Sequence, residues 1–171
     1  MTRTNSDSAT TSVLSQAGIP NGEVTITRIF DAPRDLVFRV WTDPRHVARW
    51  WGPTWFTNPL CEMDVRPGGA ILIHMADPDG VVYPMKGMFR EIVEPERLVF
   101  TSSAFHDEDG TPLFEAVNTI TFQEEGSKTK VTVQAVIINA KPGAEGPLSG
   151  MEEGWNQSFG KVADLLAEIR A

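Results

Sequence analysis

The sequence predicts an α+β fold in which a curved antiparallel sheet of about seven strands wraps around a long C-terminal helix. Residues 57–139 alternate apolar and polar side chains in short runs separated by turn sequences. Residues 151–169 place apolar side chains at steps of three and four, which is typical of an amphipathic helix. The connections between the runs are too short for crossover helices, so consecutive strands are expected to pair in antiparallel fashion.

One strand and two short helices precede this region. Residues 23–30, EVTITRIF, alternate and are rich in β-branched residues, which predicts the first strand. In DAPRDLVFRVWTD, Asp31 is expected to cap a helix with Pro33 in its first turn. In DPRHVARWW, Asp43 and Pro44 repeat this arrangement and predict a second helix, which ends at the following Gly-Pro pair.

Later runs and their turns predict an antiparallel meander. Gly87 within one run is expected at a bulge or bend, and Gly68-Gly69 mark either another bulge or a strand end. The predicted strands are TNPLCEMDV, GGAILIHMA, VVYPMKGMFREIV, RLVFTSSAF, LFEAVNTITFQ and KTKVTVQAVII, which the long helix follows.

The chain is expected to form a single domain over residues 22–171. Residues 1–21 begin with a segment rich in Ser and Thr and have no apolar core typical of a secretory signal. We therefore expect a flexible N-terminal tail over residues 1–21.

Composition excludes several classes of partner. A formal net charge of −8 disfavours binding to nucleic acid or to anionic membrane surfaces, which both require clustered basic residues. The single Cys61 and three scattered His give no metal-ligand spacing, and no sequence motif indicates a cofactor. No run approaches the length of a membrane-spanning helix, and a cytoplasmic location is expected.

Two segments carry a resemblance to a known family. TITRIFDAPRDLVFRVWTDPRHVARWWGP and GMEEGWNQSFGKVADLLAEI resemble the heat-shock chaperone ATPase activator homologue (AHSA) family. The resemblance covers residues 22–170 and implies the helix-grip fold of the START-like superfamily, which includes polyketide cyclases and the birch-pollen allergen (SRPBCC). That superfamily combines ligand carriers with enzymes, so the fold alone does not select a function.

The resemblance does not include the separate N-terminal domain by which eukaryotic activators bind their chaperone. A chaperone is therefore not predicted as a partner from the family name alone. An interaction module, either associated with a chaperone or homodimeric through the outer sheet face, is kept as an alternative.

Aromatic and methionine residues gather on the elements expected to border a cavity between sheet and long helix. Such side chains supply apolar contact area, and the indole N–H adds a hydrogen-bond donor. Because Trp50 and Trp51 are adjacent on a helix, one is expected to point inward and the other toward a rim. Alternatively, these side chains are ordinary core. The predicted ligand-binding residues are Trp50, Trp51, Trp55, Met75, Met85, Phe89, Met151, Trp155 and Phe159.

Glu115, His46, Tyr83 and Ser102 are the nearest candidates for catalysis, because no nucleophile, metal or phosphate-loop motif occurs. Glu115 is expected to be exposed if the apolar residues between 114 and 122 face inward. A bulge would instead turn it into the cavity as a general-base candidate.

The leading hypothesis is binding of a small hydrophobic or amphipathic molecule between sheet and helix. A cyclase, aromatase or hydrolase acting in the same cavity is the first alternative.

Overall fold

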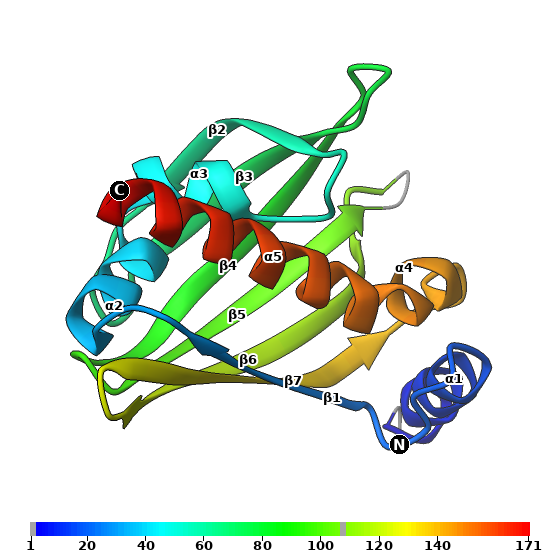
Figure 1. Ribbon diagram of the computed structural model, residues 1–171. Helices are drawn as coiled ribbons and strands as arrows, with labels where there is room; N and C mark the ends of the chain where they lie inside the picture. The colour runs from blue at the N-terminus through cyan, green and yellow to red at the C-terminus, as the bar shows by residue number, and fades with distance from the viewer. Residues whose placement is uncertain (1–2, 107–108) are drawn as a thin grey trace.

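A computed structural model describes residues 3–106 and 109–171 and confirms the predicted α+β class. Within these residues, seven strands form one antiparallel sheet in the order β1-β7-β6-β5-β4-β3-β2 (Figure 1). The meander from β2 to β7 therefore follows chain order, and β1 joins it beside β7. The strands are β1 (Glu23–Phe30), β2 (Thr57–Met63), β3 (Ala70–Ala76), β4 (Val82–Val93), β5 (Arg97–His106), β6 (Pro112–Glu125) and β7 (Lys128–Ala140).

The long helix α5 (Met151–Arg170) crosses the face around which the strands curve (Figure 1). Phe159 on this helix is 0% exposed, and its ring meets that of Phe30 on β1 edge to face at 5.5 Å. Burial of one such side chain stabilises the fold by about 1.5–3 kcal/mol. The apolar stripe of α5 is thus held by the inner face of the sheet, as the sequence predicts.

The two short helices lie beside the C-terminal part of α5 (Figure 1). They are α2 (Arg34–Thr42) and α3 (Pro44–Trp50). Asp43 caps α3 as predicted, since its carboxylate accepts a hydrogen bond from the backbone N–H of Arg45 at 2.9 Å. The expected cap of α2 by Asp31 is wrong: Pro33 occupies the cap position and makes no side-chain hydrogen bond there.

Glycines allow close backbone approaches in the curved sheet. A Cβ atom on Gly87 would lie 2.0 Å from the carbonyl oxygen of Thr101, so β4 and β5 can approach here only with glycine. The register shift between these strands lies at Phe89 to Glu91, beyond Gly87. Gly68 has φ +83° and precedes β3, so the Gly68-Gly69 pair marks a strand end.

A helix occupies most of the segment for which the sequence predicts a flexible tail. Helix α1 (Arg3–Gln16) lies beside the end of β7 and the short helix α4 (Glu145–Ser149) (Figure 1). Val13 and Leu14 are buried against a cluster that includes Phe114 and Ile137. The tail prediction considered only the polar composition and missed this short apolar face.

None of the described helices is both long enough and apolar enough to cross a membrane.

Candidate functional site

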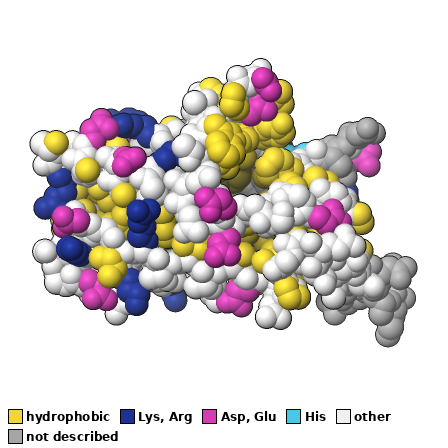
Figure 2. Space-filling view, turned by 45° about the vertical axis from the view of Figure 1, so that its right-hand side comes forward, with side chains coloured by type: hydrophobic (Ala, Val, Ile, Leu, Met, Phe, Trp, Pro, Cys, Tyr) yellow, Lys and Arg dark blue, Asp and Glu magenta, His cyan; other side chains and the backbone are white. Residues whose placement is uncertain are grey.

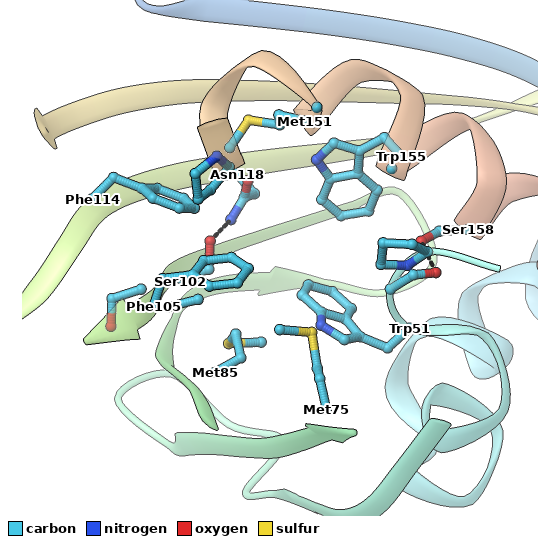
Figure 3. Close-up of a pocket in the computed structure, with 17 residues that line it drawn as sticks. Trp51, Met75, Met85, Ser102, Phe105, Phe114, Asn118, Met151, Trp155 and Ser158 are labelled. Carbon is cyan, nitrogen blue, oxygen red and sulfur yellow. Dashed lines mark hydrogen bonds between the residues drawn. The ribbon is translucent and has the colours of Figure 1, made fainter. Parts of the chain in front are cut away.

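A cavity of about 160 Å³ lies between the inner face of the sheet and the N-terminal half of α5. The surface shows a hollow with hydrophobic side chains on its rim (Figure 2). The cavity walls come from the loop after α3, from β3 to β6 and from the α4–α5 region (Figure 3). The lining residues are Trp51, Gly52, Pro53, Met75, Met85, Ser102, Ser103, Ala104, Phe105, Phe114, Asn118, Pro147, Gly150, Met151, Gly154, Trp155 and Ser158.

The adjacent tryptophans at the end of α3 have different positions. Trp50 is 1% exposed, and its indole N–H donates to the carbonyl oxygen of Val40 at 2.9 Å. Trp51 is the C-cap residue, with an extended backbone that turns its side chain toward the cavity. Its ring meets that of Trp155 edge to face at 5.5 Å. One tryptophan therefore anchors the core while the other forms a wall.

Hydrogen bonds hold the loop after Trp51 against its neighbours. The side-chain amide of Asn58 donates to the carbonyl oxygens of Ala48 at 3.0 Å and Trp51 at 2.8 Å. The hydroxyl of Ser158 on α5 donates to the carbonyl oxygen of Gly52 at 3.0 Å (Figure 3). Gly52 has φ +89°, a conformation that favours glycine. The Trp51 wall is thus positioned from both β2 and α5.

A hydrogen-bonded polar pair, Asn118 and Ser102, lies within the mainly apolar wall. Asn118 is 1% exposed, and its side-chain nitrogen donates to the Ser102 hydroxyl oxygen at 2.9 Å (Figure 3). The same nitrogen donates to the carbonyl oxygen of Phe100 at 3.3 Å. Sequence reasoning missed Asn118, although it shares the inward parity of Phe114 and Ile120. A polar residue on an otherwise apolar strand face was the signal that could have found it.

The family model for activator of Hsp90 ATPase homolog 1-like proteins matches residues 31–167. The chain belongs to this family. Two similar solved structures are proteins of Nitrosomonas europaea and Arthrobacter aurescens. The first is 27% identical with a TM-score of 0.74, covering 88% of this chain and 97% of the other. The second is 27% identical with a TM-score of 0.77, covering 86% and 87%.

An AHSA1 protein from Silicibacter pomeroyi shows the same fold, with a TM-score of 0.70 at 23% identity. Its match covers 85% of this chain and 97% of the other. No curated protein matches the chain. The family match and these neighbours place this AHSA1-like chain in the START-like superfamily, as its sequence resemblance implies.

The cavity of this AHSA1-like chain is uncharged. Among the described residues, those that line it include no Asp, Glu, Lys, Arg or His. No cluster of metal-binding side chains occurs in the described part of the chain. The side chains with shifted pKa values lie outside the cavity. Burial raises the pKa of the Cys61 thiol to about 11 and lowers the pKa of Lys161. Hydrogen bonding to Arg45 lowers the pKa of Asp43.

Only one of the candidate catalytic side chains, Ser102, lines the cavity. The Tyr83 hydroxyl donates to a carboxylate oxygen of Asp77 at 3.4 Å, and its ring packs beside Phe105. His46 is half-buried on α3 outside the cavity. A bulge does occur after Glu115, between β6 and β7, but the side chain of Glu115 is not part of the cavity wall.

The predicted ligand-binding residues separate into three groups. Trp51, Met75, Met85, Met151 and Trp155 line the cavity. Trp50, Phe89 and Phe159 belong to the packed core, each with an exposed fraction of 1% or less. Trp55 is 61% exposed. Residues that sequence reasoning did not select include Phe105 and Phe114, which the strands bring to the cavity from β5 and β6.

Proposed function

We propose that this protein binds a small hydrophobic or amphipathic molecule in the cavity between the sheet and α5. The observation that carries the proposal is a cavity of about 160 Å³ whose lining includes four aromatic and three methionine side chains and no charged side chain among the described residues. Sites for small molecules are typically concave and apolar, with few polar groups that orient the ligand. Asn118 and Ser102 supply such groups here.

The wall composition favours binding over acid–base catalysis. General acid–base chemistry needs a titratable side chain within hydrogen-bond reach of the reacting atom. Glu115, His46 and Tyr83 lie outside the set of described residues that line the cavity. Ser102 lines it, but its hydroxyl oxygen accepts a hydrogen bond from the side-chain amide of Asn118, and an amide cannot act as its general base.

Native mass spectrometry of freshly purified protein tests whether a small molecule co-purifies. The expected result is a mass excess that disappears on denaturation and identifies the bound compound. A protein without such an excess is then titrated with the neutral dye N-phenyl-1-naphthylamine, whose fluorescence rises in apolar surroundings.

The chain offers a matched pair of variants for this titration. Trp51 lines the cavity, whereas Trp55 in the same loop is 61% exposed. Trp51→Ala is expected to weaken dye binding about tenfold, because loss of an aromatic wall removes about 1.4 kcal/mol of contact free energy. Trp55→Ala should bind as the wild type does. Equal affinities of wild type and both variants would contradict the proposal and favour the interaction-module alternative.

A further inference from the structure

The inner part of the cavity is suited to an uncharged group. Its lining among the described residues has no ionisable side chain that could pair with a ligand charge. A charge that enters apolar surroundings without a partner loses hydration that nothing replaces. A carboxylate or ammonium group is therefore disfavoured inside this cavity.

The volume sets the size of the group that fits between the walls of this hollow, which is open to solvent on one side. The cavity of about 160 Å³ is similar to an engineered cavity of about 150 Å³ in another protein, which binds benzene. Trp51, Trp155, Phe105 and Phe114 provide ring faces and edges around this space (Figure 3). One aromatic ring of a ligand fits within these walls, with edge or offset contacts to the side-chain rings, and the rest of a larger molecule such as N-phenyl-1-naphthylamine extends through the open side of the hollow.

Asn118 presents an unused acceptor on the wall. The side-chain nitrogen is identified by its contact with the Phe100 carbonyl oxygen, which can only accept. The two N–H groups of Asn118 then donate to Phe100 and Ser102, and the Oδ1 oxygen remains available as an acceptor. Among the described residues, no group donates a hydrogen bond to this Oδ1 atom.

Trp155 presents an unused donor. Its indole nitrogen lies on the side of the ring that is turned toward Asn118 in the close-up (Figure 3). Within the described part of the chain this N–H donates to no acceptor, and it is not fully buried. A hydroxyl group can donate one hydrogen bond and accept another, so it suits a wall that offers both an acceptor and a donor.

We infer that the cavity takes a neutral aromatic ring compound that carries a hydroxyl group, such as a phenol. The hydroxyl donates to Oδ1 of Asn118 and accepts from the indole N–H of Trp155, while the ring occupies the apolar space. This inference rests on the proposed function and names the chemical class of its ligand.

Three small probes of similar shape test the inference: 4-ethylphenol, ethylbenzene and 4-ethylbenzoate. Their dissociation constants are measured at pH 7 from amide chemical-shift titrations of the isotope-labelled protein. We expect 4-ethylphenol to bind about tenfold more tightly than ethylbenzene, because hydrogen bonds of ordinary net strength account for a difference in affinity of this size. The benzoate anion is expected to bind at least tenfold more weakly than the phenol.

Two variants test whether Asn118 and Trp155 cause the preference for 4-ethylphenol over ethylbenzene. Asn118→Leu removes the acceptor, and Trp155→Phe removes the donor while it keeps an aromatic ring. Each is expected to reduce the ratio of ethylbenzene to 4-ethylphenol dissociation constants toward one. Thr119→Val is the matched control, since Thr119 follows Asn118 on β6 with the opposite strand parity. The Trp155→Phe result stands by itself if Asn118→Leu does not fold.

The outcomes separate the two proposals. Equal affinity for 4-ethylphenol and ethylbenzene, or tight binding of the benzoate, overturns the hydroxyl-aromatic inference but leaves ligand binding intact. A preference that persists in both variants also overturns it. No shift with any of the three probes contradicts the inference together with the proposed function.

Discussion

Gly154 provides a way to close the cavity without disturbing the fold. It lies on α5 and lines the cavity, and a Cβ atom built on it meets no other atom within 4 Å. Gly154→Leu therefore directs an apolar side chain into the space that a ligand ring would occupy. We expect it to weaken binding of N-phenyl-1-naphthylamine at least tenfold.

The same substitution is expected to stabilise the protein. Glycine within a helix is less favourable than alanine by about 0.8–1 kcal/mol, and leucine is almost as favourable as alanine. Gly154→Ala should raise the free energy of unfolding by about 1 kcal/mol, which corresponds to about 2–4 °C in melting temperature. Gly154→Leu should match or exceed this value, since its side chain is buried against the apolar wall.

Gly160→Ala is the matched control. Gly160 is on the same helix but does not line the cavity, and its added Cβ atom meets only Arg28, at 3.9 Å. We expect Gly160→Ala to raise the melting temperature like Gly154→Ala and to leave dye binding unchanged. Thermal unfolding by circular dichroism and the fluorescence titration measure both properties. If the Gly154→Leu variant is folded and binds the dye as tightly as the wild type, the conclusion that the ligand occupies this cavity is refuted.

Other predictions concern the support of the site. Asn58→Ala leaves the carbonyl oxygens of Ala48 and Trp51 without their side-chain donor and should lower the free energy of unfolding by about 1–3 kcal/mol, measured by urea titration. Leu14→Ala should cost about 2–5 kcal/mol by the same assay, whereas a flexible tail would show no change. Burial raises the pKa of the Cys61 thiol to about 11, so between pH 9 and 11 the thiol stays protonated in the folded state but ionises in the unfolded state. The free energy of unfolding should therefore fall as the pH rises from 9 to 11. Cys61→Ser should remove this part of the pH dependence.

Local sequence patterns were sufficient for the seven strands and for α2, α3 and α5, but not for α1 and α4. The period-two runs define strands because successive side chains point to opposite faces of a sheet, and the observed meander follows from their short connections. The Asp43-Pro44 pair likewise defines the start of α3, since both residues act within one helical turn. The order of the elements predicted that the curved sheet wraps the long helix, the family resemblance implied the same helix-grip fold, and the structure confirms it.

The tertiary structure decided which side chains face the cavity. Sequence spacing indicates that Trp50 and Trp51 diverge, but only the hydrogen bond to Val40 and the end of α3 determine which one enters the core. Asn118 lies on a predicted inward face, yet its role depends on Ser102 from the neighbouring strand. The apolar face of α1 likewise became visible only against β7 and α4, because burial depends on partners that are distant in the chain.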